Sequence, residues 1–382
     1  MKILRVISSM HPKNGGPCQG IRNSIPAMEK LGVVNEVVCL DAPTEQFIAN
    51  DPFVVHALGK AKGGWAYNSN FQAWLRDHLR EYDVVIMHGL WLYPSYAASN
   101  AIKKFRKDNP RTELKFYVMP HGMLDPWFQR DKSRRLKALR NEIYWKWLEK
   151  NVVNSADGLL FTCEQELLLA RGTFKGYSPK LELNIGYGIQ APPNLLGQVL
   201  PSKVNKPYWL FLSRIHPKKG VDQLLNAYFQ LKKEHVNVPD LVIAGPLESA
   251  YAESMRVKAA ACGDIHFVGM LQGDAKWKAF YGCEAFVLPS HQENFGISVV
   301  EAMACNKPVL ITNQVNIWRE IEEGQGGLID TDTNEGTYQI LKKFALMDET
   351  QKKEMGHNAG RVYQKNFTIE EAAKKMLDAF IR

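Results

Sequence analysis

The chain has 382 residues, of which 45% are hydrophobic and 23% are charged, and its formal net charge is +8. These values lie close to globular averages, so they exclude a disordered chain and allow about two folded domains. The six cysteines are scattered without paired spacing, which argues against a disulfide framework or a zinc site and favours reduced thiols in the cytoplasm. No apolar run is long enough to span a membrane, and the N-terminal apolar stretch is too short for a signal peptide.

Short β-rich apolar runs alternate with helical patterns along the first half of the chain. This rhythm predicts βαβ units and a parallel sheet with helices on both faces. Ligands of such sheets bind beyond the carboxyl ends of the strands, so site residues are expected directly after strands. The predicted strands are 3–8, 33–40, 83–88, 114–120 and 158–162.

Two features follow strands of this first series. After the first strand, Gly15, Gly16 and Gly20 predict a turn that opens a helix and lets the backbone approach a ligand, although a plain turn is an equal alternative. The chain contains no P-loop motif. His121 follows the fourth strand, where it either faces a ligand as a hydrogen-bond donor or is a buried structural histidine.

The segment Arg130–Lys150 carries eight basic and three acidic residues together with Tyr144, Trp145 and Trp147. Such a helix either lies against an anionic membrane surface or is a solvated helix whose tryptophans pack inward. No nucleic-acid-binding motif is present, so no nucleic-acid partner is expected.

The strand–helix pattern then restarts after a Pro-rich stretch at 190–207, which reads as an interdomain linker. Two doubly wound domains in tandem, with a cleft between them, are therefore predicted. The strands of the second series are 208–213, 240–245, 265–270, 284–290, 308–312 and 326–329.

Arg214 and Lys219 lie in the loop after the first strand of the second series. An Arg fork and a Lys point charge at this place are suited to a diphosphate group. Either residue taken alone is as well explained by solvation.

The stretch 293–301 places two carboxylates, Glu293 and Glu301, around the start of a predicted helix at Ile297–Ala304. The unpaired N–H groups and the dipole of a helix start favour phosphate, and Gly296 allows close approach of a ligand. Glu301 suits the paired hydroxyls of a ribose, and Glu293 suits a sugar hydroxyl or a charge that develops nearby. The alternative is a capped helix with incidental acids.

Two other patterns are weaker. The GxGxxA match at 186–191 is followed by two prolines instead of a helix, so a dinucleotide site is not expected there. The acidic turn at 330–332 lacks supporting metal ligands and is interpreted as a loop.

Taken together, these motifs resemble the family 4 glycosyltransferases, which have the two-domain GT-B fold and retain the anomeric configuration. The resemblance covers nearly the whole chain, and the Glu pair with the Arg/Lys loop is its most specific part. The matching stretches are GGP (15–17), HGM (121–123), SRIHPKKG (213–220), FVGML (267–271) and ENFGISVVE (293–301).

The resemblance implies a role for each matching residue in binding the donor. Arg214 and Lys219 would hold the diphosphate, Glu301 the ribose, and Glu293 and His121 the donor sugar. The remaining implied donor contacts are Gly16, Met270, Leu271, Asn294, Phe295, Gly296 and Ile297. The implied catalytic residues are Glu293, His121, Arg214 and Lys219.

The resemblance also implies the domain roles. Residues 1–192 would form the acceptor-binding domain, with the C-terminal helix at 368–382 crossing back onto it. Residues 206–367 would bind the nucleotide sugar. Acceptors would contact the first domain, where Trp91, Tyr93 and Trp127 either stack on sugar rings or simply pack in the core.

The implied activity is a retaining, metal-independent hexosyl transfer without a cofactor. The expected donor is UDP-glucose, with GDP-mannose next, and the expected acceptor is a saccharide or a polyprenyl-linked saccharide of a bacterial surface polysaccharide. Such a protein would be cytoplasmic, with Arg130–Lys150 as a possible contact to the inner face of the membrane. A nucleotide-sugar epimerase of the same fold and a non-catalytic nucleotide-sugar-binding protein are the alternatives.

Overall fold

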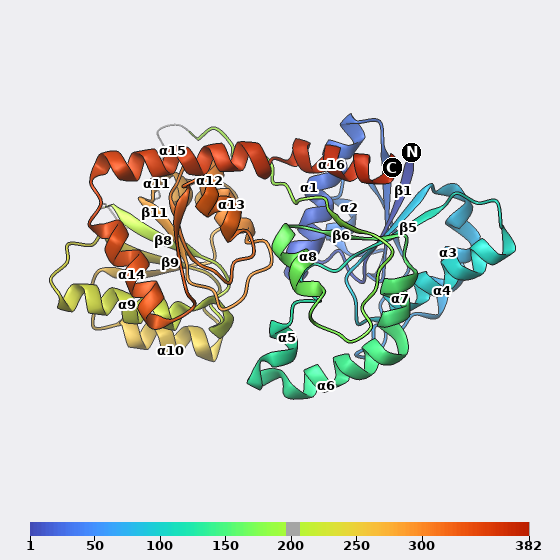
Figure 1. Cartoon of the computed structure of the whole chain (residues 1–382), viewed down its shortest axis with the longest axis horizontal. Coiled ribbons are helices and arrows are strands. Elements are labelled where there is room, and N and C mark those ends of the chain that lie inside the picture. The colour runs from blue at the N-terminus through green and yellow to red at the C-terminus, as the bar shows by residue number, and fades with distance from the viewer. Residues whose placement is uncertain (196–206, 382) are drawn as a thin grey trace. The chain divides into compact units, whose positions relative to one another are not determined.

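The computed structural model describes residues 1–195 and 207–381 of the chain (Figure 1). By its internal contacts the chain divides into two compact units. Unit 1 comprises Met1–Gly188 and Ile369–Arg382, and unit 2 comprises Ile189–Thr368. Most of the predicted linker, at 196–206, lies outside the described residues.

Unit 1 is a seven-stranded parallel sheet with the order β3-β2-β1-β4-β5-β6-β7. Helices α1 and α16 pack together on one face, while α3, α4 and α7 cover the other (Figure 1). The strands are β1 (Lys2–Val6), β2 (Val34–Cys39), β3 (Val54–Ala57), β4 (Val84–His88), β5 (Lys115–Met119), β6 (Gly158–Phe161) and β7 (Glu182–Asn184). The helices are α1 (Gly16–Lys30), α2 (Gln46–Ala49), α3 (Ser69–His78), α4 (Tyr93–Asp108), α5 (Trp127–Arg130), α6 (Arg135–Tyr144), α7 (Lys150–Ser155), α8 (Glu164–Ala170) and α16 (Ile369–Ile381).

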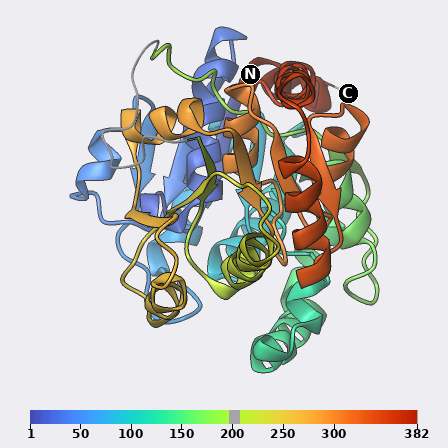
Figure 2. The ribbon, with the colours of Figure 1, turned by 90° about the vertical axis from the view of Figure 1, so that its left-hand side faces the viewer.

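Unit 2 is a six-stranded parallel sheet with the order β10-β9-β8-β11-β12-β13. Helices α9, α10 and α14 pack on one face and α12, α13 and α15 on the other, which Figure 2 shows from the side of this unit. The strands are β8 (Tyr208–Leu212), β9 (Asp240–Ala244), β10 (Ile265–Gly269), β11 (Ala285–Leu288), β12 (Val309–Thr312) and β13 (Gly327–Asp330). The helices are α9 (Val221–Lys233), α10 (Ala250–Ala259), α11 (Gly273–Gly282), α12 (Ile297–Ala304), α13 (Trp318–Glu323), α14 (Asn334–Ala345) and α15 (Glu349–Asn366).

Both units are therefore doubly wound α/β sheets, and the predicted fold class is confirmed. The central strands are buried on both faces, as in β4 and β9, because helices cover each side of a parallel sheet. This is why their sequences read as continuous apolar runs. The short edge strands β3 and β7 were not predicted, since their residues are mostly half-exposed and carry no such run.

The C-terminal helix α16 belongs to unit 1. Its apolar face, from Ile369 to Phe380, is buried. The Arg5 guanidinium contacts the Met376 sulfur at 3.4 Å, and the Tyr117 hydroxyl donates to the Ala379 carbonyl at 3.3 Å. Among the described residues, no helix has the length and apolar character needed to cross a membrane.

Candidate functional site

The topological switch point of unit 2 lies between β8 and β11. From β8 the chain first extends the sheet through β9 and then returns to the other side with β11, so the loops after β8 and β11 flank one crevice. Arg214 and Lys219 follow β8, and Glu293 follows β11. The fold thus brings the predicted cations and one predicted carboxylate to the place where open α/β sheets bind ligands.

Lys219 and Glu293 form an ion pair at this switch point. The Lys219 side chain is 7% exposed and that of Glu293 is 22% exposed. Burial disfavours the charged form of Glu293, but the adjacent Lys219 ammonium outweighs this effect and holds the pKa of Glu293 below its ordinary value of 4.5. Glu293 is therefore a carboxylate at neutral pH, and a largely buried cation orients it.

Gly220 allows the two loops to approach each other. Its φ is +68°, and a Cβ at this position would lie 1.9 Å from the Pro289 carbonyl oxygen. Beside it, the His291 N–H donates to the Lys218 carbonyl at 2.9 Å. A side chain at residue 220 would push the cation loop away from the carboxylate loop.

The loop that carries Glu293 is also fixed from its other side. The Glu293 N–H donates to the Gln314 carbonyl at 2.9 Å, and the Asn316 N–H donates to the Glu293 carbonyl at 3.0 Å. Asp332, in the acidic turn after β13, lies 2.7 Å from Nδ1 of His291. The turn interpreted from sequence as an isolated loop thus supports the site loop, and no cluster of three metal-ligating side chains occurs among the described residues.

Helix α12 begins at Ile297 and ends at Ala304, as predicted. Gly296 precedes it in the left-handed conformation, with φ +77°. The Val299 N–H donates to the Gly296 carbonyl at 2.9 Å, whereas the N–H groups that precede it at a helix start have no intrahelical acceptor, so this turn presents donors and positive potential. The ring of Phe295 points away from solvent and packs edge-on against Phe367, with 5.6 Å between ring centroids.

Glu301 lies within α12 and pairs with Lys276 of α11 at 2.6 Å. Burial raises the pKa of Glu301 above its ordinary value, and the Lys276 ammonium opposes this shift. Lys276 also lies 4.4 Å from the ring centre of Trp277. The sequence analysis missed Lys276, although its place in the first turn of the helix after β10 was a signal that could have been used.

A hollow of about 340 Å³ opens beside this pair. Its volume lies within the usual range for small-molecule sites. Arg214 and Lys276 line it together with the predicted base-contacting residues Met270 and Leu271. The remaining lining residues are Leu212, Ser213, Ala244, Gly245, Gln272 and Gly273. Backbone and two cations at three adjacent strand ends thus form one concave surface.

In unit 1, His121 follows β5 with a φ of +53°, and its Nε2 lies 2.9 Å from Nδ1 of His88 at the end of β4. Burial, reinforced by the Arg5 guanidinium, lowers the pKa of His121 to about 3. Burial, the neighbouring His121 ring and Arg5 lower the pKa of His88 as well. Both rings are therefore neutral at pH 7, and His88 is a partner of His121 that the sequence did not suggest.

The glycine turn after β1 is held by a residue from the rejected GxGxxA match. The Tyr187 hydroxyl donates to the Gly16 carbonyl at 2.8 Å. A Cβ on Gly20 would lie 1.9 Å from the same hydroxyl oxygen. Gly20 is thus explained by packing under Tyr187, whereas Gly16 begins helix α1 with nothing within 4 Å of its Cβ position.

Two of the three predicted acceptor-stacking aromatics are core residues. Trp91 is 8% exposed and Tyr93 is 7% exposed, and both belong to the main core cluster of unit 1. Their burial favours the alternative that both rings pack in the core, and contact of either ring with a sugar stays a prediction. Trp127, the first residue of α5, is half-buried and lies edge-on to Phe128.

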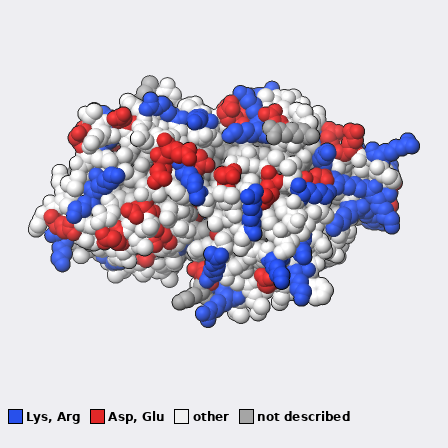
Figure 3. Space-filling model, in the orientation of Figure 1, with Lys and Arg blue, Asp and Glu red and all other residues white. Residues whose placement is uncertain are grey.

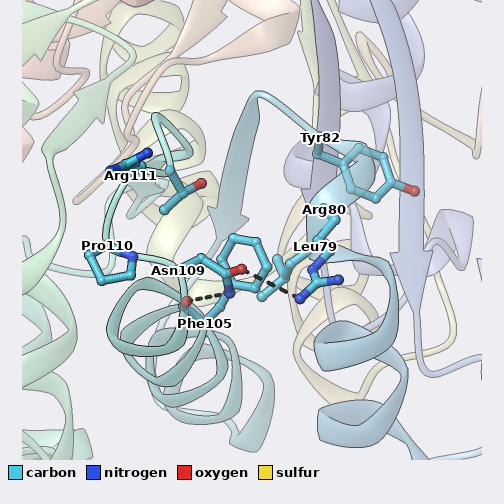
Figure 4. A pocket seen from close by; sticks show the side chains of 8 residues that line it. Leu79, Arg80, Tyr82, Phe105, Asn109, Pro110 and Arg111 are labelled. Carbon is cyan, nitrogen blue, oxygen red and sulfur yellow. Dashed lines mark hydrogen bonds between the residues drawn. The ribbon is translucent and has the colours of Figure 1, made fainter.

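A second hollow, of about 530 Å³, lies between the ends of α3 and α4 (Figure 4). Leu79, Arg80 and Tyr82 line one side of it, and Arg80 donates to the Asn109 side chain at 3.4 Å. This hollow lies at the amino ends of β4 and β5, opposite the end where such sheets bind ligands. It is not part of the candidate site.

Two models of glycosyltransferase families match the chain. "Glycosyl transferase 4-like domain" matches residues 15–182, and "Glycosyl transferases group 1" matches residues 196–362. Together the two matches take in most of both units.

Curated relatives are similar over part of the chain. The D-rhamnosyltransferase WbpZ of Pseudomonas aeruginosa is 28% identical over 177 residues, which are 44% of this chain and 43% of that protein. The O-antigen chain mannosyltransferase B of Escherichia coli is 25% identical over 177 residues, or 45% of each chain. The chain spans a little under half the length of these relatives.

A solved structure is similar over the whole chain. Anabaena Alr3699/HepE, in complex with UDP and glucose, has a TM-score of 0.72, covers 100% of this chain and 99% of its own, and is 17% identical. This similarity shows that the two chains share a fold.

Proposed function

We propose that the chain is a glycosyltransferase that transfers a hexose from a nucleotide-diphosphate sugar to a saccharide or lipid-linked saccharide, a proposal that the two matching family models support. We propose UDP-glucose as the donor, with GDP-mannose as the alternative. We further propose that the transfer retains the anomeric configuration and requires neither a metal nor a cofactor.

The proposal rests on the positions of the charged side chains that follow β8, β10 and β11. Arg214 and Lys276 line one hollow, and Lys276 pairs with Glu301 at 2.6 Å. A nucleoside diphosphate presents this combination in reverse: anionic oxygens for the cations and paired ribose hydroxyls for the carboxylate. Glu301 is thus proposed to bind the ribose, with Met270 and Leu271 beside the base.

The proposed chemistry is electrostatic. Bond cleavage at the anomeric carbon leaves negative charge on the departing diphosphate, and cations with a helix N-terminus stabilise such charge when they are already in place. Arg214, Lys219 and the first turn of α12 supply these groups. Glu293, kept ionised by Lys219, is proposed to lie by the donor sugar, where it stabilises positive charge at the anomeric centre.

Some expectations stay predictions. These are the contacts of Gly16 and His121 with the donor, of the backbone amides of Asn294, Phe295 and Gly296 with sugar and phosphate, and of Trp127 with the acceptor. A cytoplasmic location and a role in surface-polysaccharide synthesis are likewise proposed.

Nucleotide binding tests the proposed donor site. We expect UDP to raise the melting temperature more than GDP or ADP, since a ligand at 100 times its Kd adds about 2.7 kcal/mol of stability. Replacing UDP with 2′-deoxy-UDP removes one ribose hydroxyl and should weaken binding to the native chain by roughly tenfold, the effect of one good hydrogen bond to a charged group.

Glu301→Gln should bind UDP more weakly and should lose this discrimination between UDP and 2′-deoxy-UDP. Glu284→Gln is the matched control, because Glu284 also pairs with a lysine of unit 2, Lys352 at 2.5 Å, at the opposite end of β11. A shift with GDP alone would replace the proposed donor. No shift with any nucleotide would overturn the proposed function.

Transfer itself is tested with UDP-glucose and a panel of saccharide acceptors. NMR of the product should show an α-linkage when the donor is α-configured, and EDTA should leave the rate unchanged. Conversion of the donor to an epimer without any acceptor would instead identify an epimerase.

A further inference from the structure

Helix α6 and the π-helical turn η4 (Trp145–Glu149) form a surface element of unit 1 with a buried inner face and an exposed, apolar outer face. The inner face packs on the core: Asn141, Trp145 and Glu149 are 3%, 2% and 0% exposed. The Trp145 indole N–H donates to the Lys175 carbonyl at 3.0 Å, and its ring stacks on Phe174 with 4.7 Å between centroids. These contacts fix which face is turned outward.

The outer face carries four large apolar side chains, called here the outer stripe. Leu136 is 85% exposed, Leu139 61%, Ile143 51% and Trp147 69%. Their spacing of three or four residues places them in one row along the helix. Single exposed apolar residues are normal on a protein surface, but a contiguous row of this size marks an interaction surface.

Cations flank the outer stripe on both sides. At 100° per residue along α6, Arg135 lies along one edge, and Lys137 and Arg140 along the other. Lys146, in η4, lies 5.8 Å from the ring centre of Trp147. All four are exposed, whereas Glu142 is the exposed acid between residues 135 and 147. Figure 3 shows Lys and Arg side chains, a few Asp and Glu side chains and uncharged surface along its lower edge, where α5 and α6 lie.

We propose that the outer stripe and its four flanking cations dock on the surface of an anionic lipid bilayer. The stripe would enter the boundary between headgroups and acyl chains, and the cations would reach the anionic headgroups through their long aliphatic stems. Trp147 has the amphipathic ring that is enriched at this depth. Helix α6 has 10 residues, about half the length of a crossing helix, so it lies along the surface.

The same features argue against other occupants. A second copy of this face would bring its own cations against the cations of the first, which costs free energy. A nucleic acid would satisfy the cations but would leave the four apolar side chains against phosphates. An anionic bilayer complements both the charge and the apolar row.

The membrane contact rests on the geometry of α6 and does not depend on the proposed function. Combined with that function, it places unit 1 where a lipid-linked saccharide would be presented. The acceptor class thereby becomes a polyprenyl- or lipid-carried sugar in preference to a free oligosaccharide.

The test is flotation of the full chain with vesicles of phosphatidylcholine alone and with added phosphatidylglycerol. The native chain should float with the anionic vesicles and far less with the neutral ones. The variant L136Q/L139Q/I143Q/W147Q should lose at least tenfold in apparent affinity for anionic vesicles. The control variant V257Q/L346Q changes two exposed apolar residues of unit 2, 66% and 69% exposed, and should bind like the native chain.

Two further measurements keep the result unambiguous. The melting temperature and UDP binding of the quadruple variant should match those of the native chain, since all four side chains are exposed. Vesicles with brominated acyl chains should quench part of the fluorescence of the native chain, and Trp147→Phe should remove that part. Equal flotation of the quadruple variant, or equal binding to neutral vesicles, would overturn the proposal, whatever the outcome of the nucleotide experiments. The proposal would also be overturned if the quadruple variant differed from the native chain only in self-association.

Discussion

Glu149 lies at the point where η4 meets α7 and is fully buried. Its Oε1 accepts from the Trp91 N–H at 2.9 Å and from the Ser95 hydroxyl at 2.7 Å. Its Oε2 has no hydrogen-bond partner within the described part of the chain. Burial raises the pKa of Glu149 to about 7, although these two donors oppose the shift.

This raised pKa predicts how the stability of unit 1 depends on pH. A folded-state pKa above the ordinary value of 4.5 means that the contribution of Glu149 is fully present below pH 4.5 and is lost as the pH rises through about 7. Glu149→Gln keeps the acceptor oxygen and cannot ionise. It should therefore gain stability relative to the native chain between pH 5 and pH 8, by about 1–3 kcal/mol.

Urea unfolding of both chains at several pH values, followed by the near-UV signal, measures this difference. Glu142→Gln is the control, because it removes a carboxylate from an exposed position of α6. A Glu149→Gln variant whose difference from the native chain does not change with pH would contradict the prediction.

At the scale of elements, the candidate site depends on how closely two loops approach. Gly220 separates the turn η5 (Pro217–Lys219) from α9, and the Pro289 carbonyl occupies the place of its missing side chain. The ion pair of Lys219 with Glu293 forms across this contact. The backbone at Gly220 therefore affects both the stability of unit 2 and the geometry of the candidate site.

Gly220→Ala should lower the free energy of unfolding of unit 2 by more than about 2 kcal/mol, through the strain of its positive φ and the clash with backbone. It should also weaken nucleotide binding, because the two loops must separate. Gly263→Ala is the matched control: nothing lies within 4 Å of its Cβ position, so its effect should stay within about 0.5 kcal/mol. Thermal unfolding and UDP titration measure both effects, and equal behaviour of the two variants would refute this account of Gly220.

For the whole molecule, the chain divides into two compact units, and α16 is the last segment of unit 1. Phe380 is 6% exposed and packs 5.0 Å from the Tyr117 ring, whereas the next residue, Ile381, is 69% exposed. Packing of the C-terminal helix thus contributes to the stability of one unit specifically.

Phe380→Ala should destabilise unit 1 by roughly 3 kcal/mol, the lower end for loss of a buried phenyl ring, and leave unit 2 unchanged. Calorimetry with and without UDP separates the two units, because most of the proposed UDP contacts lie in unit 2 and UDP should raise that transition more than the other. Ile381→Ala, at the neighbouring exposed position, should leave both transitions in place. A loss of UDP binding in Phe380→Ala would show instead that the units are not independent.

The sequence by itself determined the fold class, the strands buried on both faces and the bounds of α12. These features are local: a continuous apolar run, a glycine at a helix start and a loop directly after a strand are each visible within about ten residues. The positions of Arg214, Lys219 and Glu293 at the ends of β8 and β11 follow from the same local reading.

Only the tertiary structure decided which side chains pair with each other. Lys276 and Glu301 are separated by 25 residues and His88 and His121 by 33, so no short-range pattern joins them. The burial of individual aromatic side chains outside the strands could not be predicted either: Trp91 is a core residue and Trp147 a surface residue, although both are tryptophans in amphipathic surroundings. Which face of an element is covered depends on what packs against it, and that is set by contacts between segments distant in the chain.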